Sequence, residues 1–201
     1  MSSTRFAASA QAENSEIWYL RDLTAAGTCG GAPTLKLLSE TIGGTSVVEH
    51  DIEGANNISF DREEVAGRTI ESGNWEVRFW FRLPTGGGPA NQVDVKIERF
   101  NSTCALQETI FIRNNIKLDK GVTKEYLAQP KPVGQVVFVA GDFLVVTFTD
   151  SGGNQSKFLR YDFDAANTAD SRLITPDPVV VAATTSLPVF QRRMRQVARR
   201  F

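Results

Sequence analysis

The segment from Trp75 to Leu83 changes side-chain character at every step, and this alternation constrains the fold more than any other feature. One side carries Trp75, Val77, Phe79, Phe81 and Leu83, and the other carries Glu76, Arg78, Trp80 and Arg82. Successive side chains of a β-strand point to opposite faces, so the pattern predicts a strand. Because one face is apolar and the other is charged, this strand should cover a core and expose its back to water, as in an antiparallel sandwich.

Further strands are predicted at intervals of roughly ten residues, with glycine-containing loops between them. Their ranges are 93–98, 108–113, 135–139, 143–149 and 157–162. The loops at 84–89 and 150–154 predict two hairpins, one joining 75–83 to 93–98 and one joining 143–149 to 157–162. The strand at 143–149 is apolar on both faces, so we expect it at the centre of its sheet. The predicted fold class is all-β, an antiparallel β-sandwich or jelly roll.

The two ends of the chain differ from this middle part. Residues 1–16 are small and polar without periodicity, which predicts an extended N-terminal arm. Residues 17–171 are assigned to the β-sandwich domain. Residues 172–201 are assigned to an extended C-terminal arm, because prolines interrupt its apolar stretch. This arm is expected to end in a short basic helix.

The C-terminal segment combines an apolar stripe with arginines. Phe190, Met194, Val197 and Phe201 are spaced i, i+4, i+7 and i+11, which places them on one face of a helix. So short a helix is marginal in water, so it should fold against another surface. The predicted partner-binding residues are Phe190, Arg192, Arg193, Met194, Arg195, Val197, Arg199, Arg200 and Phe201.

Three hypotheses compete for this segment. Its apolar stripe can pack on the protein's own body, or dock into a groove of another subunit. Alternatively, the arginines can contact nucleic acid or an anionic membrane. This third hypothesis is the least favoured, because without the five terminal arginines the net charge falls from −1 to −6.

Groups for catalysis do not come together in the sequence. The only histidine, His50, lies between Glu49 and Asp51 and is interpreted as part of a polar surface cluster. Cys29 and Cys104 show no metal-binding spacing; free thiols are the preferred interpretation, although a disulfide stays open. We therefore predict no catalytic residue, no metal site and no cofactor, in a protein that is not an enzyme.

Trp80 is a candidate ligand platform. It lies on the charged face of its predicted strand, between Arg78 and Arg82. A tryptophan beside arginines can stack on a sugar ring or on a partner's side chain. The preferred alternative is that an arm or a second sheet covers it.

Several strand patterns together resemble the β-sandwich proteins of bacteriophage particles, the accessory proteins that decorate capsids or sit on necks and tails. They are Trp75-Glu-Val-Arg-Phe-Trp-Phe, Val93-Asp-Val-Lys-Ile-Glu-Arg, Gly141-Asp-Phe-Leu-Val-Val-Thr-Phe, Leu159-Arg-Tyr-Asp and Asp170-Ser-Arg-Leu. The resemblance covers roughly residues 70–175 and includes no chemical motif.

This resemblance implies a non-enzymatic virion structural protein with a decoration or cement role. Its expected partners are capsid, neck or tail subunits and copies of itself. It would be made as a soluble protein in the host cytoplasm and end in the virion, since no stretch reaches membrane-spanning length. The alternative is a carbohydrate- or receptor-binding sandwich module, such as a tail-fibre adhesin, with Trp80 as its platform.

Overall fold

The computed structural model describes residues 15–24, 29, 34–40, 47–54, 56–84, 91–152, 156–161, 171–176 and 178–179. Every regular element in this part of the chain is a β-strand, which confirms the predicted all-β class. Most of the predicted N-terminal arm and all of the predicted C-terminal helix lie outside the described residues.

Fourteen strands make up the described fold. The first seven are β1 (Glu16–Thr24), β2 (Thr34–Ser39), β3 (Val48–Asp51), β4 (Ile58–Glu64), β5 (Arg68–Ile70), β6 (Gly73–Arg82) and β7 (Gln92–Phe100). The others are β8 (Leu106–Lys117), β9 (Thr123–Val133), β10 (Val136–Phe138), β11 (Asp142–Gly152), β12 (Phe158–Tyr161), β13 (Arg172–Thr175) and β14 (Pro178–Val179).

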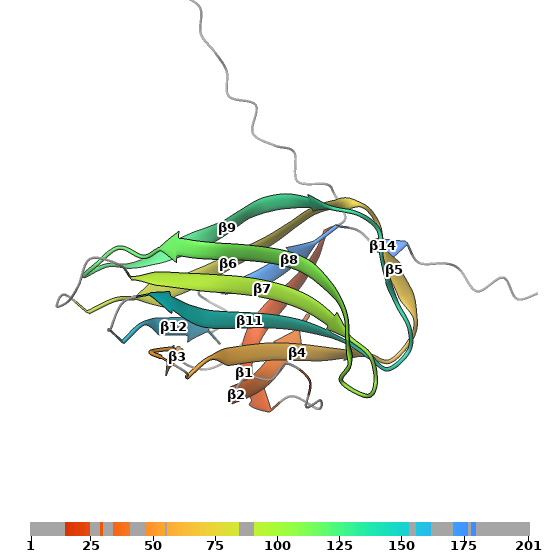
Figure 1. Cartoon of the computed structure of the whole chain (residues 1–201), viewed down its shortest axis with the longest axis horizontal. Coiled ribbons are helices and arrows are strands. Elements are labelled where there is room, and N and C mark those ends of the chain that lie inside the picture. Colours follow the sequence, from red (N-terminus) through yellow and green to blue (C-terminus); the bar gives the residue numbers. More distant parts are fainter. Residues whose placement is uncertain are drawn as a thin grey trace, which may run out of the picture.

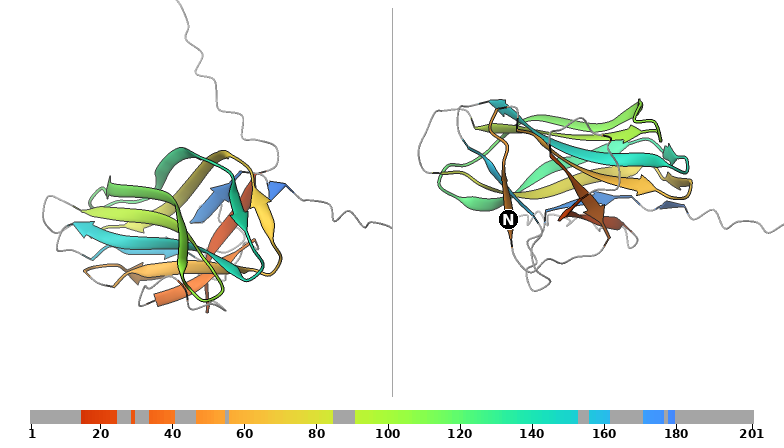
Figure 2. Two further views of the ribbon diagram at one scale, coloured as in Figure 1. Left: turned by 45° about the vertical axis from the view of Figure 1, so that its right-hand side comes forward. Right: turned by 90° about the horizontal axis from the view of Figure 1, so that it is seen from below.

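Eleven of these strands form one large sheet that folds into two layers. Its order is β3-β12-β6-β13-β1-β2-β4-β11-β7-β8, and β9 pairs with β6 beside this path. The strands β4, β11, β7 and β8 lie side by side in one layer, with β6 and β12 in the layer behind (Figures 1 and 2). A separate sheet of β10, β5 and β14 closes one end of the sandwich (Figure 1). Among the described pairs, only β2 and β4 run parallel.

The predicted strand at Trp75–Leu83 is confirmed as β6, but both predicted hairpins are wrong. β6 pairs with β9, β12 and β13 rather than with β7. β11 pairs with β4 and β7 rather than with β12. The chain therefore passes between the two layers after β6 and again after β11. Side-chain alternation specifies which face of a strand is buried, but it does not specify the neighbouring strand.

The core lies between the two layers and is rich in aromatic side chains. Phe79 of β6 meets Phe148 of β11 with ring centroids 5.4 Å apart, at a steep angle. Phe148 also contacts Phe60 of β4, whose ring lies 5.1 Å from that of Tyr161 on β12. Edge-to-face contacts of this kind contribute about 0.5–1.5 kcal/mol each beyond the area that they bury. The aromatic contacts thus join strands of both layers.

Several strands occupy segments where the sequence suggested none, among them β9 and β13. β13 lies within residues 172–201, assigned to an arm, yet it pairs with β1 and β6 inside the large sheet. Leu173 and Ile174 are both buried there, so its apolar run serves the core. β9 contains Pro130 and Pro132 near its end. Because proline lacks a backbone donor, this part of the sequence predicts a loop rather than a strand.

Cys29 and Cys104 form a disulfide, so the preferred interpretation as free thiols is wrong. Their Cα atoms lie 5.0 Å apart although 75 positions separate them in the sequence. Cys29 is buried and packs with Phe143 and Val145 on the outward side of β11, while Cys104 is exposed. The disulfide therefore pins the residue at position 29 onto the outer face of one layer.

Candidate functional site

The outward side of β6 and its neighbours carries a set of paired charges around one tryptophan. We call this surface the belt; it comprises Glu49, Arg78, Trp80, Arg82, Glu125, Arg160 and Arg172. In the sheet register, Trp80 is opposite Arg160 of β12 on one side and Glu125 of β9 on the other. The predicted platform residues thus lie together on one surface.

Each glutamate of the belt binds two arginines. Arg82 holds Glu49 through three hydrogen bonds: Nε donates to Oε1 at 3.0 Å and to Oε2 at 3.2 Å, and Nη2 donates to Oε2 at 2.7 Å. Arg160 Nε lies 3.1 Å from Glu49 Oε1. The donated hydrogen bonds of Arg82 are the main reason why the pKa of Glu49 is lowered. Glu49 therefore stays ionised and fixes two guanidinium groups in place.

The second glutamate repeats this arrangement on the other side of Trp80. Glu125 Oε2 lies 3.7 Å from Arg78 Nη1, and Glu125 Oε1 lies 3.6 Å from Arg172 Nη2. Arg78 also pairs with Glu76. The belt contains four arginines and two glutamates. Together with Glu76 these residues carry a net charge of +1.

Trp80 is half-buried at the centre of the belt, and this partial exposure lies between the exposed platform and the covered side chain that the sequence left open. Its backbone N–H donates to Ser171 Oγ at 2.9 Å, and Ser171 Oγ in turn donates to the carbonyl of Arg160 at 2.6 Å. This hydroxyl bridges β6 and β12 just before β13 begins. It holds the backbone of Trp80 in a fixed position between the two arginine–glutamate groups.

The outward side of β4 and β11 is different, because its side chains are buried. We call it the covered face; it comprises Ser59, Asp61, Phe143, Val145 and Thr147. Ser59 Oγ and Thr147 Oγ1 share a hydrogen bond of 2.8 Å. Asp61 is 1% exposed, and neither carboxylate oxygen has a hydrogen-bond partner among the residues that the structure describes.

Burial raises the pKa of Asp61 to about 7, and the negative charge of Glu63 adds to the shift. An ionised carboxylate in such a place is costly, so the proton is lost only as the pH approaches neutrality. Asp61 was not among the predicted site residues. A charged residue on the outward side of a strand is expected to be solvated, and no local pattern reveals that this one is buried.

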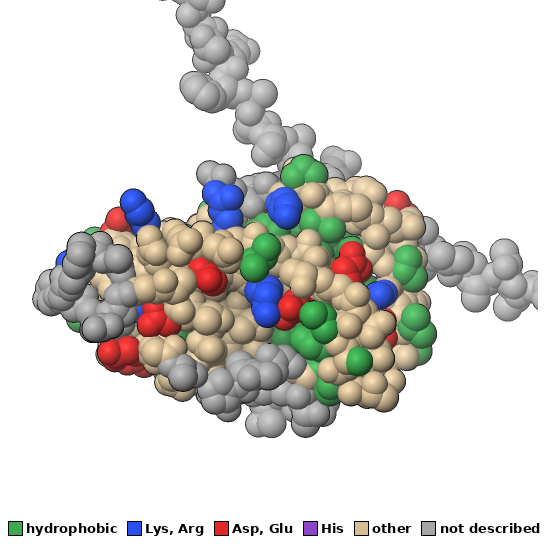
Figure 3. All heavy atoms as spheres, viewed as in Figure 1, with side chains coloured by type: hydrophobic (Ala, Val, Ile, Leu, Met, Phe, Trp, Pro, Cys, Tyr) green, Lys and Arg blue, Asp and Glu red, His purple; other side chains and the backbone are tan. Residues whose placement is uncertain are grey.

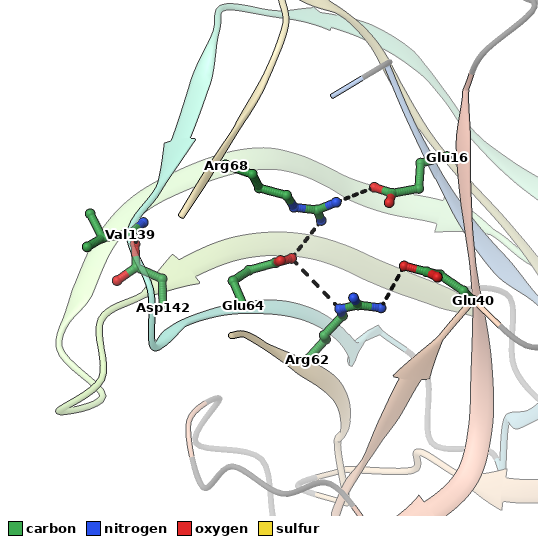
Figure 4. A network of polar contacts seen from close by, with 7 residues as sticks. All are labelled: Glu16, Glu40, Arg62, Glu64, Arg68, Val139 and Asp142. Atoms are coloured by element: carbon green, nitrogen blue, oxygen red, sulfur yellow. Dashed lines mark hydrogen bonds and ion pairs between the residues drawn. The ribbon is translucent and has the colours of Figure 1, made fainter. Parts of the chain in front are cut away.

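A chain of alternating charges lies at the end of the sandwich near β5 (Figure 4). Arg68 binds Glu16 Oε2 and Glu64 Oε1, both at 2.6 Å. Arg62 lies 4.0 Å from Glu64 and 3.1 Å from Glu40, and its guanidinium stacks 3.8 Å above the ring of Trp18. These contacts tie β1, β4 and β5 together.

Neither carboxylate on Arg68 is available as a catalytic acid or base. Both are engaged by its guanidinium, and Glu64 is 3% exposed. Burial raises the pKa of Glu64 despite the opposing effect of Arg68 and Arg62. The charged chain is therefore a structural clamp rather than a reactive pair.

The remaining predicted site residues are only partly placed. His50 Nε2 lies 3.2 Å from the carbonyl of Asn56, and burial lowers its pKa. The described residues hold no group of three or more His, Cys, Asp or Glu side chains that can bind a metal. The predicted partner-binding residues from Phe190 to Phe201 lie outside the described part of the chain. No helix among the described residues has the length and hydropathy needed to cross a membrane.

Comparison with known sequences yields no relative. No protein-family model matches the chain, and no curated protein sequence matches it.

Comparison with solved structures finds the same fold in hydrolases. A CocE/NonD family hydrolase from Staphylococcus aureus has a TM-score of 0.58 at 12% identity, over 81% of this chain and 36% of that one. An α-amino acid ester hydrolase has a TM-score of 0.54 at 12% identity, with the same coverage. An aminopeptidase from a marine sediment archaeon of the Thaumarchaeota has 0.54 at 10% identity, again over 81% and 36%. The chain thus spans about a third of each of these hydrolases.

These matches correct the predicted function. The expectation of a non-enzymatic virion protein is wrong, since the structures with TM-scores above 0.5 are hydrolases. A structure of the infectious bursal disease virus, Gt strain, has a TM-score of only 0.30 over 75% of this chain, which is too low to carry an argument. The bacteriophage resemblance is thereby reduced to a shared all-β architecture, because strand patterns recur in unrelated proteins that use one fold.

Proposed function

We propose that this chain is the β-sandwich part of a hydrolase and works with a catalytic unit outside these 201 residues. The observation that carries the proposal is the match to four structures of three hydrolases, with TM-scores of 0.54–0.58. The sandwich corresponds to 36% of each hydrolase, which leaves 64% (100 − 36) for other functions.

The chemistry of the described residues supports a separate catalytic unit. A hydrolase needs a nucleophile or activated water together with a base in hydrogen-bond reach. In the described part of the chain, the ring of His50 is engaged by a backbone carbonyl. Asp61 is sealed in the covered face, and Glu16 and Glu64 are both held by Arg68. The reacting groups would therefore come from the catalytic unit.

We assign the contact with that unit to the belt. Tryptophan and arginine are the side chains that contribute most often to protein–protein binding, and the belt holds four arginines around Trp80. Their glutamate partners fix the guanidinium groups before binding, which lowers the entropy lost on association. The solved hydrolases act on amino acid esters and on peptides, as two of their names state. We extend this to the assembly as cleavage of an ester or amide bond of an amino acid.

The test is to isolate the tagged full-length chain from its own cells and to assay hydrolysis of amino acid p-nitrophenyl esters and p-nitroanilides. We expect activity in the isolated assembly and none in the purified chain alone. Trp80→Ala and Arg82→Glu should each lower the activity that is isolated with the chain, at least about tenfold for a contact that stabilises by 1.4 kcal/mol. Ile112→Ala on β8, exposed in the other layer, is the matched control and should change nothing.

Two outcomes contradict the proposal. Activity in the purified chain alone would place the catalytic groups within these 201 residues. An isolated assembly that does not hydrolyse these substrates would remove the link to hydrolysis. A loss of activity that follows from unfolding is recognised by measuring the thermal unfolding of each variant.

A further inference from the structure

Three exposed valines form an apolar strip at the end of the sandwich. Val65, Val137 and Val139 are 83%, 47% and 62% exposed. Hydrophobic side chains are visible at this end of the molecule, where β5 and β10 curve over the sandwich (Figures 1 and 3). Grouped apolar side chains on a surface mark a place where another segment binds. We call these three residues the valine strip.

The backbone holds the members of the strip close together. The N–H of Gly141 donates to the carbonyl of Glu64 at 2.7 Å, which joins the end of β4 to the turn before β11. A side chain at Gly67 would lie 3.8 Å from the Cα atom of Val139, so these two backbones are in contact. Val137 is opposite Thr69 in the pairing of β10 with β5.

The turn that carries Val139 is rigid. Asp142 Oδ2 accepts a hydrogen bond of 3.0 Å from the N–H of Val139, and the N–H of Asp142 donates to the carbonyl of Val139 at 3.0 Å (Figure 4). The charged chain of Glu64 and Arg68 lies directly beside this turn in Figure 4. The strip is therefore a preformed surface, which keeps the entropic cost of binding low.

We propose that the valine strip binds the C-terminal segment of the same chain, residues 190–201. The strand β14 pairs with β5 through Pro178 and Val179, so the chain that leads to this segment starts within the same small sheet. β10, which carries Val137, lies on the other side of β5, about 10 Å from β14 at the usual strand spacing. The ten residues 180–189 can span at most about 35 Å, so they reach the strip easily.

The chemistry of the segment matches the strip. Phe190, Met194, Val197 and Phe201 share one face of a helix, and they would cover the valines. Glu63 lies two positions before Val65, and Glu71, whose Oε1 accepts a hydrogen bond from Gln135, lies two positions after Thr69, so the arginines of the segment would have acidic side chains nearby in the sequence to pair with. Glu63 is exposed and Glu71 is half-buried, which leaves the former open to solvent.

The occupant is the chain's own segment rather than that of a second copy because of the short connection. A linker of this length gives an effective concentration on the order of millimolar, well above usual protein concentrations. The docked segment would also satisfy the need of a short amphipathic helix for a surface on which to fold. This inference is independent of the belt and of the proposed hydrolase role.

Hydrogen exchange of the full-length protein, followed by mass spectrometry, tests the docking. We expect amides in residues 190–201 to exchange at least about tenfold more slowly than those of the same sequence as a free peptide. Val137→Asn with Val139→Asn should remove this protection, and Met194→Asp should remove it from the other partner. The matched control, Leu106→Asn with Ile112→Asn, changes two exposed apolar residues on β8 and should leave the protection intact.

Three results overturn the proposal. Exchange of the segment as fast as the free peptide in the unchanged protein would overturn it. Protection that persists after the two asparagine substitutions in the strip would do the same. Protection that increases with protein concentration, together with a dimer in sedimentation, would assign the strip to a second copy instead. Exchange in β5 and β10 monitors whether each variant retains the small sheet.

Discussion

The strands β6 and β11 both lie in the middle of the sandwich, but their outward faces differ in exposure to solvent. The outward side of β6 is the belt, where Trp80 and its neighbouring arginines are only half-buried. The outward residues of β11 belong to the covered face, with Phe143, Val145 and Thr147 only 8%, 0% and 7% exposed. Cys29 packs on this face and is held there by its disulfide.

This difference separates a surface built for contact from one built for stability. Charges on the belt are paired with each other, so they need no covering segment. The covered face contains apolar side chains and a carboxylate without a hydrogen-bond partner among the described residues, and the disulfide holds Cys29 on it. Changes to the covered face should therefore alter the free energy of unfolding much more than changes to the belt.

The largest effect is expected from loss of the disulfide. Cys104→Ser should lower the free energy of unfolding by about 4 kcal/mol, because a bond across 75 positions restricts the unfolded chain. Chemical denaturation with and without a reductant measures this change. The reductant should destabilise the unchanged protein to the level of the variant and leave the variant itself unaffected. If the unchanged protein has the same unfolding midpoint with and without the reductant, the disulfide is not formed.

The next largest effect concerns the pH dependence that arises from Asp61. Its folded pKa of about 7 lies above its unfolded value, so the folded state binds the proton more tightly. The associated stability is complete below about pH 4 and is lost as the pH rises through 7. At pH 8 the ionised carboxylate should cost up to about 4 kcal/mol relative to pH 4.

Asp61→Asn isolates this contribution. The difference in unfolding free energy between variant and unchanged protein should shift in favour of the variant as the pH rises from 4 to 8. Glu63→Gln, at an exposed neighbour on the same strand, is the control and should show a much smaller shift. A difference that stays constant with pH would mean that Asp61 is solvated or paired.

The smallest effect is expected on the belt. The side chains of Arg82 and Glu49 are 40% and 29% exposed, so water screens their attraction. A double-mutant cycle with Arg82→Ala and Glu49→Ala should give a coupling energy of about 0.2–1 kcal/mol that decreases with salt. A coupling of several kcal/mol would show that the belt, like the covered face, is needed to hold the fold together.

The sequence already distinguished these two faces. Three of the four outward residues of the strand at Trp75–Leu83 are charged, which predicted a face open to solvent. The outward face of β6 is indeed partly exposed. The strand at 143–149 is apolar on both sides, which predicted a central position, and β11 indeed pairs with β4 and β7. Side-chain periodicity reports burial directly, because a strand exposes each face to a single environment.

Other features could not be predicted from local patterns. The pairing of β6 with β9 joins segments whose intervening chain crosses to the other layer and back, so neighbours in sequence are not neighbours in the sheet. The disulfide joins residues 75 positions apart, and the burial of Asp61 is not visible in the side-chain pattern of its own strand. The belt could be anticipated only in part: Arg78, Trp80 and Arg82 share one strand, whereas Glu49 and Glu125 come from two others.

Photo-crosslinking from position 80 in the native assembly is the most direct test of the central claim. A photoreactive amino acid in place of Trp80 should form an adduct with a second polypeptide, and that polypeptide should cleave amino acid esters or amides. The same amino acid in place of Ile112 should give no such adduct. Crosslinks to a protein without hydrolytic activity, or none at all from position 80, would contradict the account.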